Sequence, residues 1–160
     1  TRLQGDWSSD VCSSDLVELR VRVDSDVVIQ CRGGQISQVL MNLVNNAHDA
    51  VLSLNSDSSE KWVEIYVHRT RSSAVVEVTD SGRGIADDVV DKMMQPFYTT
   101  KGVGKGTGLG LSISKGIAEE HNGILKYDVS SGHTRFILEL PINQGIKESN
   151  RFRLDALGHI

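Results

Sequence analysis

The apolar residues of this chain are spaced in two different ways, which predict strands and helices in turn. Residues 17–23 alternate apolar and polar side chains without a break, the period of two expected of a half-buried strand. Residues 27–31 are expected to form a second, shorter strand. From Gln35 to Leu54 the apolar side chains recur every three or four residues, as on the buried face of an amphipathic helix. The polar cluster at residues 55–59 is expected to end that helix.

The rest of the chain continues the alternation up to Pro141. The later predicted elements are a hairpin at residues 63–68 and 74–79, a short helix at 87–94, a loop at 95–107, a helix at 109–121 and a closing hairpin at 124–129 and 134–140. Gly123 is placed to stop the last helix. This order predicts an α+β fold, a two-layer sandwich in which helices cover one face of a mixed, mostly antiparallel sheet.

The two ends of the chain are expected to lie outside this domain. Residues 6–16 resemble a translated sequencing-library adapter, so we treat residues 1–16 as an artefact or a disordered segment; a natural Ser/Asp-rich linker is the alternative. Residues 143–160 show no period, and we expect a loosely attached tail. One domain over residues 17–142 remains, and any segment that normally precedes Leu16 is expected to be missing.

Composition narrows the class of protein. The chain has 160 residues, of which 39% are hydrophobic, and no apolar run approaches the roughly 18 residues of a membrane helix. Its formal charge is −4 and it has no block of Lys and Arg, so nucleic acid is not an expected partner. Without the adapter-like segment, Cys31 is the only cysteine, which suits a cytoplasmic location and a packing role. A membrane anchor elsewhere in the parent protein stays open.

Three polar side chains share one flank of the helix at residues 35–54. Asn42, Asn46 and Asp49 are spaced at i, i+4 and i+7, and therefore lie beside the apolar stripe on the same face. Carboxamide oxygens suit Mg²⁺ when nucleotide phosphates supply further ligands. The alternative is that these residues only solvate the helix flank, although Asn and Asp are poor helix formers.

An acidic residue followed by two glycines ends the strand at residues 74–79. The carboxylate of Asp80 can accept a hydrogen bond from the exocyclic amine of adenine, whereas guanine presents a carbonyl there. Gly82 and Gly84 can take positive φ and let the backbone approach a base. An ordinary turn is the alternative, because Asp and Gly are common turn residues.

A glycine-rich stretch at residues 104–110 runs directly into the helix at 109–121. Backbone N–H groups at such a helix start would face a bound phosphate. The stretch matches neither a Walker A sequence nor a Rossmann fingerprint, and a flexible loop is the alternative. Lys101 and Lys105 lie on the preceding, lid-like segment and can serve as point charges for phosphates, although Lys105 equally fits a solvated loop.

Together, these motifs and the segment Pro96-Phe-Tyr-Thr-Thr-Lys101 resemble the N, G1, F and G2 boxes of the ATP-binding domain of sensor histidine kinases, over residues 17–142. The resemblance implies the Bergerat fold and the cofactors ATP and Mg²⁺. It implies Asn46 as the Mg²⁺ ligand with Asn42 supporting it, and Asn42, Asn46 and Lys101 as catalytic residues. The implied nucleotide-binding residues are Asn46, Asp49, Asp80, Gly82, Gly84, Ile85, Phe97, Thr100, Lys101, Lys105, Gly106, Thr107, Gly108, Leu109 and Gly110.

One position separates the branches of that superfamily. Hydrolysing relatives carry a Glu as general base where this chain has Asn42, and an amide cannot accept a proton at neutral pH. Many kinases carry a basic residue where this chain has Asp49, which shifts the expected phosphate contact to Lys101. None of the histidines, His48, His68, His121, His133 and His159, is the expected phosphoacceptor.

The resemblance therefore implies an ATP-dependent protein-histidine kinase domain that passes the γ-phosphoryl to a histidine on a separate dimerisation module, and from there to a response regulator. The parent protein is expected to be a homodimer, and the domain alone is expected to be inactive. Two alternatives are a degenerate nucleotide-binding module, and an ATPase or serine kinase of the same superfamily.

Overall fold

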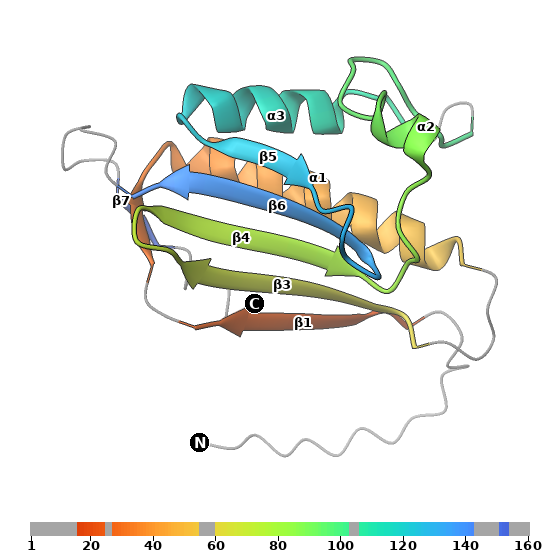
Figure 1. The fold of residues 1–160 in the computed structure, drawn as a ribbon, viewed down its shortest axis with the longest axis horizontal. Helices are drawn as coiled ribbons and strands as arrows, with labels where there is room; N and C mark the ends of the chain where they lie inside the picture. Colours follow the sequence, from red (N-terminus) through yellow and green to blue (C-terminus); the bar gives the residue numbers. More distant parts are fainter. Residues whose placement is uncertain (1–15, 25–26, 55–59, 103–105, 143–150, 154–160) are drawn as a thin grey trace.

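The computed structural model of the chain describes residues 16–24, 27–54, 60–102, 106–142 and the backbone of 151–153 (Figure 1). The adapter-like segment before Leu16 lies outside the described residues. So do the polar cluster at residues 55–59, Lys105 and most of the tail.

A five-stranded sheet forms the centre of the fold, in the order β1-β3-β4-β6-β5. The strands are β1 (Glu18–Val23), β3 (Trp62–Arg69), β4 (Ser73–Asp80), β5 (Ile124–Tyr127) and β6 (Thr134–Pro141). β1 pairs with β3 in parallel, and the other three pairs are antiparallel. The predicted mixed, mostly antiparallel sheet is confirmed.

Two helices, α1 (Gly33–Leu52) and α3 (Gly110–Glu120), cover one face of this sheet (Figure 1). The spacing of apolar residues predicts which sides of α1 and β3 pack against each other. The apolar residues at these spacings are the buried residues of both elements. The short helix α2 (Asp87–Val90) ends four residues earlier than expected, and a turn that buries Met93 replaces its last part. Among the described residues, no helix combines the length and the apolar character needed to cross a bilayer.

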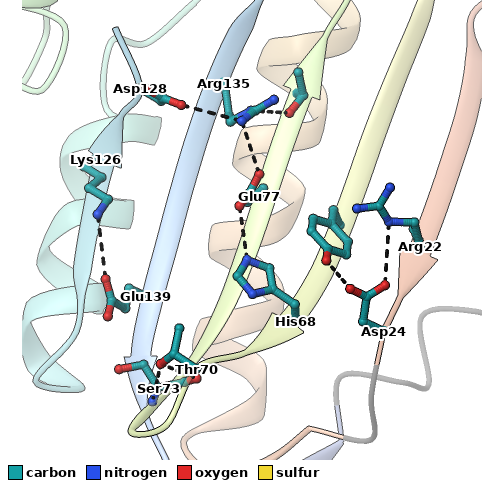
Figure 2. Close-up of polar contacts among 12 residues, drawn as sticks. Arg22, Asp24, His68, Thr70, Ser73, Glu77, Lys126, Asp128, Arg135 and Glu139 are labelled. Carbon is teal, nitrogen blue, oxygen red and sulfur yellow. Dashed lines mark hydrogen bonds and ion pairs between the residues drawn. The ribbon is translucent and has the colours of Figure 1, made fainter. Parts of the chain in front are cut away.

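The opposite face of the sheet carries polar side chains instead of helices (Figure 2). Glu77 on β4 lies 3.1 Å from the ring of His68 on β3 and 3.6 Å from the guanidinium of Arg135 on β6. Arg135 also lies 3.6 Å from Asp128. Such cross-strand pairs each add little to stability, but they match the register of neighbouring strands.

One expectation about the tail was wrong. Residues 143–160 were expected to hold no element, but Arg151–Arg153 form a strand, β7, that pairs antiparallel with β2 (Val28–Gln30). These two strands make a separate small sheet, so β2 does not join the main one. Three residues are too few to reveal an alternating period, and their backbone partner lies more than a hundred residues earlier in the sequence.

Gly123 was expected to stop the last helix, but the residue in the left-handed conformation at the end of α3 is Asn122. Asn122 takes the left-handed conformation (φ 53°), and the N–H of Gly123 bonds to the carbonyl of Ala118 at 2.8 Å. Gly123 is required for another reason, since a Cβ there would lie 2.4 Å from the backbone oxygen of Glu139 on β6. The absence of a side chain lets the chain pass closely over the sheet as it leaves the helix.

We expect Gly123→Ala to lower the free energy of unfolding by about 2 kcal/mol, because the added methyl group meets backbone that cannot move away cheaply. Gly116→Ala is the matched control. It lies inside α3, where a Cβ meets nothing within 4 Å, so it should stabilise the protein by up to about 1 kcal/mol. Urea unfolding of both variants measures the difference. Equal effects would contradict the close approach at Gly123.

Candidate nucleotide site

The predicted motif segments meet at one end of the molecule. The end of β4, the second half of α1 and the start of α3 lie together there, on the right in Figure 1. The amide of Asn42 joins the two helices, since its Nδ2 donates to the carbonyl of Gly110 at 3.2 Å and to the hydroxyl of Ser114 at 3.1 Å. Ser114 is fully buried. This contact places the glycine-rich start of α3 beside the polar flank of α1.

The ammonium group of Lys101 contacts side-chain oxygens of Asn46, the implied Mg²⁺ ligand, and of Asp49. Lys101 Nζ is 2.6 Å from Asp49 Oδ2 and 3.3 Å from Asn46 Oδ1. The pair is partly solvated, with about half of the Asp49 side chain exposed, so it contributes at most about 1 kcal/mol and can exchange readily. Asn46 and Asp49 thus form an oxygen donor set that already suits a cation.

That donor set suits Mg²⁺ only together with a nucleotide. No cluster of three or more His, Cys, Asp or Glu side chains able to hold a metal occurs among the residues that the structure describes. Mg²⁺ is a hard cation that often takes one or two protein oxygens and completes its shell with phosphate oxygens and water. The oxygens of Asn46 and Asp49 fit that pattern.

Asp80 is a buried carboxyl group at the last position of β4. Its side chain is 3% exposed and accepts a hydrogen bond from the N–H of Gly82 at 2.7 Å. Loss of solvation raises the pKa of Asp80, while the hydrogen bonds from Gly82 and Thr134 and the charge of His133 act in the opposite direction. Burial has the larger effect. Buried acids with shifted pKa values are concentrated at functional sites.

The two glycines after Asp80 have no room for side chains. A Cβ on Gly82 would lie 2.6 Å from Asp80 Oδ1 and 2.9 Å from Thr134 Oγ1. Gly84 has φ +91°, which other residues rarely adopt. A Cβ there would lie 3.0 Å from the hydroxyl of Tyr127. The turn is therefore shaped to bring backbone close to the buried carboxyl group.

The lid-side residues are also brought together. Gly108 has φ 66°, and a Cβ on it would lie 2.4 Å from the carbonyl carbon of Phe97. Phe97 itself has φ 66°, an uncommon conformation for a bulky residue, and its side chain is 76% exposed. The hydroxyl of Thr107 accepts a hydrogen bond from the N–H of Leu109 at 3.4 Å. The segment before α3 is thus folded back on Phe97, one of the implied nucleotide-binding residues.

The remaining predicted residues are placed less distinctively. Gly106 lies beside Thr99 and Lys101, where a Cβ would come within 3.0 Å of the Thr99 hydroxyl. Thr100 is exposed, and Ile85 is partly buried against the core. Lys105 falls outside the described residues, so its predicted phosphate contact stays a prediction.

Among the described residues, several side chains outside the predicted set contact the predicted ones. Ser114 contacts Asn42, Thr134 contacts Asp80, Tyr127 contacts Ile85, and the ring Nδ1 of His133 donates to the carbonyl of Gly82 at 3.2 Å. Thr134 could have been found, because it is a polar residue on the inward face of an alternating strand. The other contacts join segments far apart in the sequence.

The hydrogen bonds of His121 give this histidine a structural role. His121 is buried, its Nδ1 lies 2.8 Å from the carbonyl of Ile117, and its Nε2 accepts a hydrogen bond from the N–H of Arg32 at 3.1 Å. The carbonyl can only accept, so Nδ1 donates this hydrogen bond, and the ring connects α3 with the start of α1.

The sequence and the fold both match one family. Residues 32–144 match the sequence model of the histidine kinase-, DNA gyrase B- and HSP90-like ATPases. The chain belongs to this family. The solved catalytic domain of histidine kinase ThkA is similar to the ATPase-family domain with a TM-score of 0.64 and 30% identity, over 79% of this chain and 80% of that one. The expected α+β fold is confirmed by this likeness.

Curated relatives of the ATPase-family domain include proteins named as sensor kinases and sensor proteins. Sensor kinase CckA of Brucella abortus is 37% identical over 136 residues, which are 78% of this chain and 14% of CckA. Sensor protein FixL of Bradyrhizobium diazoefficiens is 39% identical over 131 residues, which are 78% of this chain and 24% of FixL. The chain spans less than a quarter of the length of either protein.

We expect Asp80→Asn to raise the midpoint of thermal unfolding at pH 7. The folded state raises the pKa of Asp80 above its ordinary value of 3.8, so ionising this carboxyl group costs stability as pH rises through the folded pKa. Below 3.8 the group is protonated in both states and the cost disappears. The advantage of the variant should therefore shrink as pH falls from 7 to about 4.

Differential scanning calorimetry of the full chain measures this difference. Asp91→Asn changes an exposed carboxylate and serves as the control, with little effect expected at either pH. An Asp80→Asn variant that is less stable than the wild type at pH 7 would contradict a cost of ionisation.

Proposed function

We propose that this chain is the ATP-binding catalytic domain of a sensor histidine kinase, and that the parent protein transfers the γ-phosphoryl group of Mg-ATP to a histidine on a separate dimerisation module. Membership of the ATPase family and the sensor-kinase relatives support the class of protein. The observation that carries the site is the buried carboxyl group of Asp80, with the glycine turn Gly82–Gly84 beside it.

Adenine recognition rests on the last residue of β4. A buried carboxylate with one backbone N–H bond retains free lone pairs, and an amine of the base can donate to one of them. Guanine would place a carbonyl oxygen against the same carboxylate, which costs repulsion and desolvation in a buried site. Asp80 therefore selects adenine, and the functional benefit explains why a carboxyl group that is costly to bury is present.

The phosphates would lie between α1 and the start of α3. The first N–H groups of α3 and the ammonium of Lys101 supply positive charge from two sides. Asn46 would hold Mg²⁺, with Asp49 beside it, and the metal would neutralise phosphate charge when bound. Lys101 then leaves the carboxylate of Asp49 and turns to phosphate, an exchange that the weak surface ion pair permits.

Transfer is favoured over hydrolysis by the position of Asn42. Its amide donates to Gly110 and Ser114, so it holds α3 in place and cannot take a proton from water. An imidazole acceptor needs no such base. Positioning and charge neutralisation are then the contributions of this domain. A response regulator would receive the phosphoryl group next. The domain would lie in the cytoplasm and the parent protein would be a homodimer, whether or not a membrane anchor occurs elsewhere in it. The isolated domain would bind ATP without transferring phosphate.

Isothermal titration with Mg-ATP tests nucleotide binding by the full chain. Lys101→Ala should weaken ATP binding about tenfold through loss of a charge-assisted phosphate contact, and should leave AMP binding unchanged. Lys115→Ala, on the exposed side of α3, is the matched control. Equal loss of ATP and AMP binding would place Lys101 away from the β and γ phosphates.

Phosphotransfer is tested by mixing the domain and labelled ATP with the dimerisation module of a related sensor kinase. Phosphohistidine on that module supports the kinase assignment. Nucleotide binding without phosphohistidine would indicate a passive binding module, and abundant free phosphate would indicate an ATPase.

A further inference from the structure

We infer that Tyr127 is a positioning residue for the adenine site: its hydroxyl group holds the backbone of Gly84 and Ile85 at the distance from Asp80 at which a purine base fits. This inference rests on the proposed function and assigns a further residue to it. Tyr127 belongs to none of the motifs in the sequence. It lies on β5, more than forty residues after the turn that it contacts.

The contact is direct and uses the backbone. The N–H of Ile85 donates to the hydroxyl oxygen of Tyr127 at 2.8 Å, which is a good hydrogen-bond distance. A Cβ on Gly84 would lie 3.0 Å from the same hydroxyl. The tyrosine oxygen therefore binds the turn at Ile85 and lies close to the backbone of Gly84.

The ring of Tyr127 is itself held in place. It packs against Phe136 with ring centroids 5.6 Å apart, and both residues belong to or border the buried core. Tyr127 is directly opposite Phe136 in the β5–β6 register, and Thr134 is two residues from Phe136 on the same face. Since Thr134 is paired with Asp80, one hairpin contacts both the carboxyl group and the turn beside it.

The same hairpin also holds the other end of the turn. His133, next to Thr134, donates from Nδ1 to the carbonyl of Gly82, and its ring contacts Trp62 edge-on with centroids 5.0 Å apart. The turn from Asp80 to Ile85 is therefore fixed by β5–β6 at the carbonyl of Gly82 and at the N–H of Ile85. Between these two anchors lie the residues whose backbone approaches the base.

A turn fixed at both ends gives the site a defined width. A base bound between the carboxyl group of Asp80 and a mobile turn could shift away from the carboxylate, and would then lose the amine contact. Holding the turn removes that freedom before binding, which is how pre-organisation improves affinity and selectivity. Tyr127 therefore acts on base selectivity through the turn, without having to touch the nucleotide.

Tyr127→Phe tests this role, because it removes the hydroxyl group and keeps the ring against Phe136. Titration of the full chain with Mg-ATP should show about fivefold weaker binding, which corresponds to about 1 kcal/mol. ITP lacks the amine that Asp80 accepts, so ITP binding should weaken less and the preference for ATP should fall. The amide of Ile85 should also exchange its hydrogen faster in the variant.

Tyr66→Phe is the matched control. It removes a hydroxyl that bonds to Asp24 from the opposite face of the same sheet, and it should change neither affinity nor the preference for ATP. Unchanged ATP binding in Tyr127→Phe would overturn the inference. Equal weakening of ATP and ITP would also overturn it, since that result indicates a general loss of structure.

Two further measurements separate the possible failures. If Tyr127→Phe does not fold, the wild-type amide of Ile85 is measured instead: slow exchange without nucleotide supports the contact, and exchange as fast as in an exposed loop overturns it. If wild-type ATP binding is absent, or is unaltered in Asp80→Asn, the proposed function fails, whatever the exchange rate of Ile85.

Discussion

The pairing of β4 with β6 is the constraint on which the site depends. It sets Asp80 directly opposite Thr134 and places both on the face that the helices cover. The residues of a strand alternate between faces, so a slip of one residue would turn Asp80 toward the solvent side and remove the carboxyl group from the interior. The apolar residues Val76 and Val78 oppose Leu138 and Phe136 in the same register. Core packing therefore holds the acidic group at its position.

At Asp80, the side chain that would favour folding differs from the one that the proposed ligand needs. The fold buries Asp80 with backbone and hydroxyl donors around it, and burial still raises its pKa. A neutral side chain would suit the folded chain better, but it would lack the charge that the proposed site uses to discriminate among bases. Proteins commonly keep such unfavourable groups where a ligand needs them, and the surrounding core supplies the compensating stability.

Local sequence patterns predicted most of the fold and identified the motif residues, because helix and strand periods and glycine-rich turns are short-range features. The amphipathic α1 and the alternating β3 and β6 follow directly from their buried residues. The contacts of Tyr127 with Ile85 and of Asn42 with Ser114 could not be predicted in this way, since each joins residues more than forty positions apart. The β2–β7 pair was missed for the same reason. The resemblance to histidine kinases identified motif residues, but not the neighbours that hold them.

The two hydrogen bonds from Asn42 restrict which side chain can occupy this position. Both use the Nδ2 group as donor, one to a backbone carbonyl and one to a fully buried serine. A glutamate at this position would bring an acceptor against the carbonyl of Gly110, and would leave the helix pair without its connecting donor. Exchanging Asn42 for glutamate would therefore disturb the contact between α1 and the start of α3, in addition to supplying a proton acceptor.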